Sequence, residues 1–144
     1  MATDLTDISA KIVTMLAGIT QLHGVYNEEV GKPTDGQYPF ATVVFKSGDG
    51  QFGDTKRNLR RYRFLINVYV ERTQAGFGNS KAEDIFLTIL DSIYTLFDNN
   101  TTLDGMVKWV KVLSTEAEHV NREVGDVRLG QIEVEAVNLV DSTT

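Results

Sequence analysis

The chain has 144 residues, 42% of them hydrophobic and 24% charged, which suits one soluble globular domain with a single well-formed core. The absence of cysteine excludes disulfides and thiolate chemistry, and the net charge of −6 argues against a general nucleic-acid binder, whose affinity comes mainly from neutralised phosphates. The sequence shows no secretion signal and no apolar run of membrane-spanning length. We therefore expect a single cytosolic domain over residues 1–144 that makes no membrane contact.

The first half of the chain predicts one helix followed by strands. Residues 5–19 carry apolar side chains on one helical stripe, namely Ile8, Ile12, Met15, Leu16 and Ile19. A turn-rich stretch with a short strand at residues 25–30 leads to a β-branched strand at Phe40–Lys46. Gly48, Gly50 and Gly53 then mark a hairpin tip.

The next segment, residues 54–72, is a strongly basic strand. Its six basic and two acidic residues give a net charge of +4, which leaves the other 125 residues at −10. Apolar residues alternate along it only from Tyr62 to Val70, so only this part is expected to face the core. Fully extended, the segment would span about 60 Å, whereas a compact domain of this size is about 37 Å across. We therefore predict that Gly48–Arg61 projects beyond the body as a β-ribbon or long loop.

A second amphipathic helix is the clearest element of the chain. Ser80 and Glu83 have the spacing of a capping box, and the helix they start ends at Asp98–Asn100. Its apolar face comprises Ile85, Phe86, Ile89, Leu90, Ile93, Tyr94 and Phe97. Two strands are predicted after it, at residues 106–113 and 129–140. The pattern predicts an α+β fold, with two helices on one face of an antiparallel or mixed sheet.

No constellation of residues indicates an enzyme, a cofactor site or a metal site. Gly48, Gly50 and Gly53 match a dinucleotide-binding motif only formally, because a strand follows them where the motif requires a helix. His23 and His119 lack partners at metal-ligand spacing. The acidic residues around His119 are equally well explained by a polar loop or strand end.

The segregated charges instead predict a contact surface. Glu133 and Glu135 lie on one face of a strand, where they repel each other unless a cation approaches, and an arginine of another subunit is a plausible cation. The predicted interface residues are Lys56, Arg57, Arg60, Arg61, Arg63, Glu133 and Glu135. A β-ribbon can also enter a DNA groove, but Tyr62 begins the core face and no other basic patch supports the arm. Lys108 and Lys111 flank Trp109, which is expected at a sheet edge or contact surface.

The order of these elements resembles the tail terminator, or tail-to-head joining, family of phages with long non-contractile tails. The resemblance rests on YPFATVVF at residues 38–45, RNLRRYRFLINVYVE at 57–71 and AEDIFLTILDSIYTLF at 82–97. It implies a ring, usually hexameric, that caps the completed tail tube, ends its polymerisation and provides the surface to which the head docks.

The same resemblance implies where the protein works and what it meets. The expected partners are other copies of the chain, the tail tube protein and a head-completion or connector protein, while DNA passes through the ring without specific binding. The expected place is the head-proximal end of the tail in the virion, after assembly in the host cytoplasm. The alternatives are another neck component, such as a head-closure or tail-completion protein, or a small DNA-binding domain that uses the basic β-ribbon.

Overall fold

Two helices and five strands make up the protein. The structure, a computed structural model, describes residues 5–27, 39–52, 57–71, 79–122 and 125–141. The elements in chain order are α1 (Leu5–Ala17), β1 (Gly24–Tyr26), β2 (Phe40–Phe52), β3 (Arg57–Glu71), α2 (Asn79–Asn99), β4 (Trp109–Arg122) and β5 (Gly125–Asp141).

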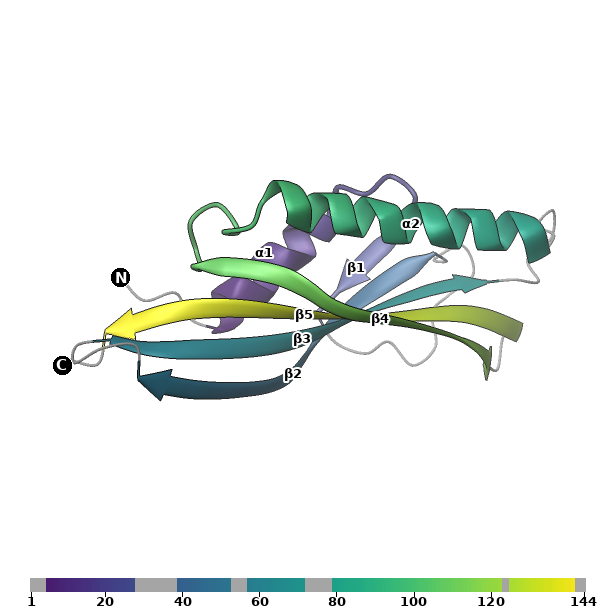
Figure 1. Ribbon diagram of the computed structural model, residues 1–144. Helices are drawn as coiled ribbons and strands as arrows, with labels where there is room; N and C mark the ends of the chain where they lie inside the picture. The colour runs from purple at the N-terminus through teal and green to yellow at the C-terminus, as the bar shows by residue number, and fades with distance from the viewer. Residues whose placement is uncertain (1–4, 28–38, 53–56, 72–78, 123–124, 142–144) are drawn as a thin grey trace.

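The strands form one twisted, mixed sheet (Figure 1). Their order is β1-β2-β3-β5-β4, so the last strand of the chain lies between β3 and β4. β1 runs parallel to β2, and the other neighbours are antiparallel. The predicted α+β fold with an antiparallel or mixed sheet is confirmed.

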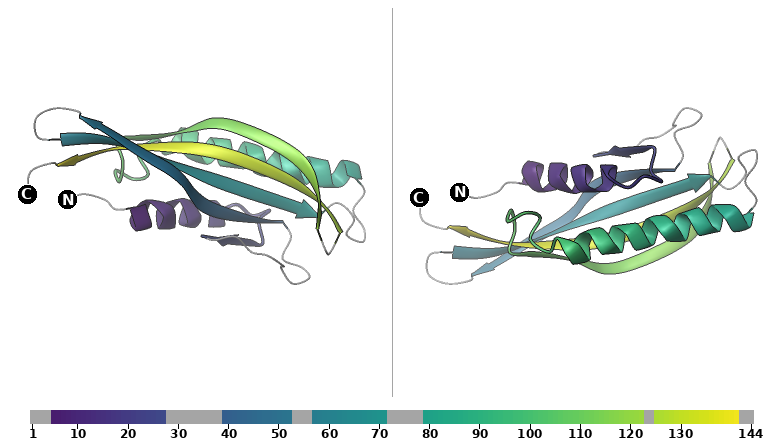
Figure 2. Two further views of the ribbon diagram at one scale, coloured as in Figure 1. Left: turned by 90° about the horizontal axis from the view of Figure 1, so that it is seen from below. Right: turned by 90° about the horizontal axis from the view of Figure 1, so that it is seen from above.

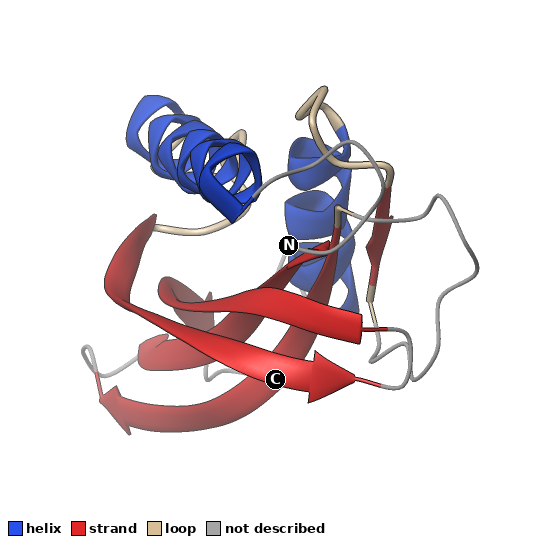
Figure 3. Ribbon diagram, turned by 90° about the vertical axis from the view of Figure 1, so that its right-hand side faces the viewer, coloured by secondary structure: helices blue, strands red, loops and turns tan. Residues whose placement is uncertain are grey.

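Both helices cover the same face of this sheet, as Figure 3 shows. The core contains the helical stripes predicted from the sequence, with Ile8, Ile12 and Leu16 from α1 and Phe86, Ile89, Ile93 and Phe97 from α2. Against them lie alternate residues of the central strands, namely Tyr62, Phe64, Ile66, Val68 and Val70 of β3 and Ile132, Val134 and Ala136 of β5. Period-two alternation therefore decides which face of each strand is buried.

The end of the sheet that carries the basic residues extends past the helices (Figure 2). β2 and β3 pair antiparallel as far as Phe52 and Asn58, so Gly48 and Gly50, which were predicted at the hairpin tip, lie in the paired strand instead. Residues 53–56 lie outside the described residues. β5 also follows β3 along its whole length, from Arg57 opposite Asp141 to Glu71 opposite Val127. The projecting part is thus the end of a three-stranded sheet. Apolar alternation stops near Tyr62, while backbone pairing with both neighbouring strands continues.

One strand prediction was misplaced. The sequence predicts a strand over residues 106–113, but β4 spans Trp109–Arg122. Residues 101–106 form turns. Pairing with β5 explains the difference, because the mostly polar residues after Val112 pair with β5 along the backbone as far as Arg122. The acidic stretch around Glu116 is therefore part of a strand.

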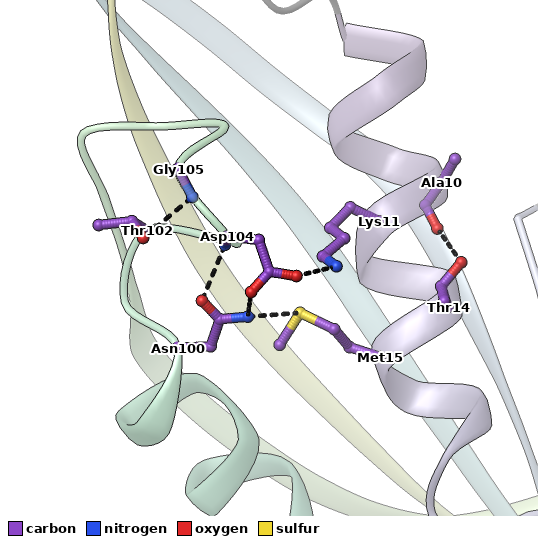
Figure 4. A network of polar contacts seen from close by, with 8 residues as sticks. All are labelled: Ala10, Lys11, Thr14, Met15, Asn100, Thr102, Asp104 and Gly105. Atoms are coloured by element: carbon purple, nitrogen blue, oxygen red, sulfur yellow. Dashed lines mark hydrogen bonds and ion pairs between the residues drawn. The ribbon is translucent and has the colours of Figure 1, made fainter.

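The turn between α2 and β4 also ties the two helices together. Leu103, Asp104 and Gly105 all have positive φ angles, of 51°, 58° and 88°. Leu103 is nevertheless buried, and the Asn100 side chain accepts a bond from the Asp104 amide at 2.9 Å. Figure 4 shows the Asp104 carboxylate reaching across to Lys11 of α1. The ammonium of Lys11, as hydrogen-bond donor and as charge, lowers the pKa of Asp104.

Candidate functional site: the sheet face opposite the helices

The face of the sheet opposite the helices has no helix over it in the part of the chain that the structure describes. We call it the open face. Its residues alternate with the core residues of each strand and form rows across the sheet. The rows that matter here contain Arg61, Arg63 and Leu65 of β3, Gln131, Glu133, Glu135 and Val137 of β5, and Lys111, Ser114, Glu116 and Glu118 of β4.

Glu135 has a cation from its own chain. The strand register places it opposite Arg63, and the Arg63 Nε donates to its Oε2 at 3.4 Å. The Glu135 side chain is only 9% exposed, whereas that of Arg63 is 38% exposed. An ion pair therefore holds a nearly buried carboxylate on this face.

Glu133 also has a cation from its own chain, supplied through an irregularity in β2. The register between β2 and β3 shifts between Phe45 and Ser47, so Lys46 has no residue directly opposite it. The Lys46 ammonium forms an ion pair with Glu133. The two residues line a hollow of about 140 Å³ together with Leu65, Ser114, Glu116 and Gln131. A neighbour's arginine is thus not needed to neutralise Glu133 or Glu135, and their place at a subunit interface stays a prediction.

Four cations without ion pairs among the described residues gather at the end of the sheet that passes the helices. Arg60 is exposed and Arg61 is half-buried, and Arg61 lies opposite Val137 of β5. The Lys108 amide donates to the Val137 carbonyl at 2.8 Å, and Lys111 lies opposite Glu135 one row further along. We call Arg60, Arg61, Lys108 and Lys111 the basic end.

This grouping corrects one expectation from the sequence. The sequence indicated no other basic patch near the arginines. The structure places Lys108 and Lys111 near them, because β5 lies between β3 and β4 and is the neighbour of both. The side chains of the two other predicted basic interface residues lie outside the described residues. Lys56 lies outside the described residues, and Arg57 begins β3 with its side chain outside them.

Glu116 and Glu118 form the opposite feature, which we call the acidic end. Both are exposed and have no ion pair among the described residues. They lie opposite Gln131 and Leu129 of β5, whereas Arg61 lies opposite Val137. Four to eight residues along β5 thus separate the two ends, or about 13–26 Å at about 3.3 Å per residue. The two ends are too far apart to neutralise each other within one chain.

Other chemistry finds little support in the described part of the chain. No group of three or more histidine, cysteine or acidic residues there could hold a metal ion. None of its helices combines the length and apolar character that crossing a membrane requires. A groove of about 470 Å³ between the end of α1 and α2 is lined by apolar surface and by hydroxyl and amide groups, with Asp91 as its one ionisable residue. His23 is exposed, and the His119 side chain lies outside the described residues.

Comparisons with known proteins give a likeness of fold. No protein-family model and no curated protein matches the chain. Among 28 matching chains of solved structures is one from the "Virion of native gene transfer agent (GTA) particle". It superposes with a TM-score of 0.54 at 18% sequence identity, over 90% of this chain and 93% of that chain. The likeness therefore concerns the whole fold and not a fragment of it.

Proposed function

We propose that the protein is a structural component of a phage-like virion, which caps the tail tube as a ring, ends tube polymerisation and forms the surface to which the head docks. The observation that carries this proposal is the fold likeness to a gene transfer agent virion chain, since it covers 90% of one chain and 93% of the other. The element order that resembles the tail terminator family supports the more specific role.

The charge distribution supports assembly with other copies. A ring is built from head-to-tail contacts, in which one surface of each subunit meets a different surface of its neighbour. The basic and acidic ends provide two such surfaces on one sheet. The partners in this proposal are other copies of the chain, the tail tube protein and a head-completion or connector protein.

Deletion of the gene from a particle-producing genome tests this role. We expect tails of irregular, excessive length in electron micrographs, because nothing ends tube polymerisation. Normal tails with heads that leak DNA would instead identify a head-closure protein, which is the alternative neck component. Normal particles in the deletion strain would reject both roles.

The basic end favours a second candidate function, direct DNA binding. Four cations without ion pairs in the described chain could contact phosphates. Affinity for a DNA duplex would then fall steeply with salt. Absence of binding at low salt would eliminate this candidate. The acidic end, which DNA would repel, is the reason that we place it second.

A further inference from the structure

We propose that the basic end of one copy docks on the acidic end of the open face of the next copy, so that Arg61 and Lys111, which share the open face of one chain, meet Glu116 and Glu118 of its neighbour. This inference rests on the proposed function and identifies the two surfaces through which the copies join. The partner is a second copy of this chain, recognised by charge.

The acidic groups of the open face differ in whether a cation of the same chain already pairs with them. Glu133 and Glu135 already have Lys46 and Arg63 as partners within the chain. Glu116 and Glu118 are exposed and have no such partner in the described part of the chain. An incoming arginine therefore gains a new ion pair only at the second set, without displacing an existing one.

The two ends lie about 13–26 Å apart along β5, so neither can serve the other within one chain. Each copy then offers one basic surface and one acidic surface without ion pairs among the described residues, which is the arrangement that a head-to-tail contact requires. β4 is also an edge strand of the sheet, so its acidic residues lie where a neighbour can approach.

The receiving surface is hollowed. Glu116 lines the hollow of about 140 Å³ on the open face, together with Ser114 and Gln131 and beside the Lys46–Glu133 ion pair. A guanidinium group presents several N–H donors in one plane, so it can bond a carboxylate and neighbouring amide or hydroxyl oxygens together. The hollow thus offers an arginine side chain a carboxylate, an amide and a hydroxyl, while Lys46 stays paired with Glu133.

The nature of the partner follows from both ends together. A DNA partner would account for the basic end only. The phosphates of DNA would repel the acidic end, whose role would then stay unexplained. A second copy accounts for both, because the same contact uses one end of each chain. Complementary charges of this kind select the partner and its register.

Cysteine cross-linking tests the contact directly, because the natural chain has no cysteine. A chain with Arg61→Cys and Glu118→Cys should form, on oxidation, a ladder of dimers, trimers and larger species. Each single variant can form only dimers. The matched control carries Arg61→Cys with Asp91→Cys, which lies on exposed α2 surface. A ladder no stronger than the control would overturn the proposal. A reaction that stops at dimers would also overturn it, since it would indicate a two-fold contact.

Charge reversal in the same double-cysteine background supplies a second measurement. Lys111→Glu alone and Glu116→Lys alone should each lower the ladder yield by about tenfold, because like charges then face each other. An equimolar mixture of the two should restore it, since the variants can alternate with complementary ends. Asp91→Lys is the control of equal charge change and should leave the yield unchanged. A mixture whose ladder yield stays as low as that of either variant alone would contradict the pairing.

The two proposals can fail separately. Irregularly long tails in the deletion strain without specific cross-linking would leave the function standing and reject this contact. Specific cross-linking together with normal tails would support the contact and reject the terminator role.

Discussion

Removal of Arg63 should destabilise the folded protein, in contrast to removal of its neighbour Arg61. Both arginines lie on the open face of β3, but among the described residues only Arg63 forms an ion pair, at 3.4 Å from Glu135. In Arg63→Met the carboxylate of Glu135, which is 9% exposed, would lose this ion pair and keep only the exposed Lys111 opposite it as a nearby cation. Arg61→Met makes the same chemical change where no ion pair among the described residues is lost.

The expected magnitude follows from the burial of the two partners. A buried polar group that loses its partner costs about 1–3 kcal/mol, and more if it is charged. Breaking a fully buried ion pair costs about 3–5 kcal/mol, but Arg63 is 38% exposed, so water replaces part of what it supplies. We therefore expect Arg63→Met to lower the free energy of unfolding by about 1–3 kcal/mol. Arg61→Met should stay within about 0.5 kcal/mol of the natural protein.

Urea unfolding followed by circular dichroism measures this difference. With a slope of about 2 kcal/mol per M, the midpoint for Arg63→Met should fall by about 0.5–1.5 M. The double variant Arg63→Met/Glu135→Met should recover most of the loss, because it leaves no uncompensated charge. Equal midpoints for Arg63→Met and Arg61→Met would refute the reasoning and would leave Arg63 free for a role at an interface.

Three further predictions concern helix packing and the turn after α2. Gly130→Ala would place a new Cβ 2.7 Å from the Phe86 ring, so we expect a loss of about 1–3 kcal/mol in thermal unfolding, partly relieved by Phe86→Leu; an unchanged melting temperature would contradict this close approach. Gly105→Ala should cost about 1 kcal/mol, because φ is +88° while nothing within 4 Å would touch the new Cβ; unaltered stability would mean that the turn can relax. Lys11→Met should raise the pKa of Asp104 in an NMR titration, since Lys11 lowers it from its ordinary 3.8. Because the folded-state pKa is the lower one, this ion pair stabilises the fold above about pH 4 and ceases to do so as the pH falls through that pKa. A constant difference in stability between the natural protein and Lys11→Met down to pH 2 would therefore contradict the assignment.

Local periodicity accounts for the parts of the fold that the sequence predicted. The apolar stripe of α2 and the alternation from Tyr62 to Val70 each lie within one element, so their spacing reveals the buried face. The start of β4 was misplaced for the opposite reason. The residues after Val112 are polar and become a strand through pairing with β5, which no local pattern indicates. Glu83 likewise fitted a local capping box, yet its carboxylate accepts a bond from Arg128 of β5 at 3.0 Å.

The sequence by itself determined the fold class, the two helices, the core face of β3 and the presence of a basic segment in an acidic chain, because each depends on composition or on spacing within one element. Only the tertiary structure decided which charges meet. The insertion of β5 between β3 and β4 brings Glu135 to Arg63, and it brings Lys108 and Lys111 near Arg60 and Arg61. It also leaves Glu116 and Glu118 about 13–26 Å from the basic end. The physical reason is that strand order sets these distances, and residues far apart in the chain become neighbours only when the sheet forms.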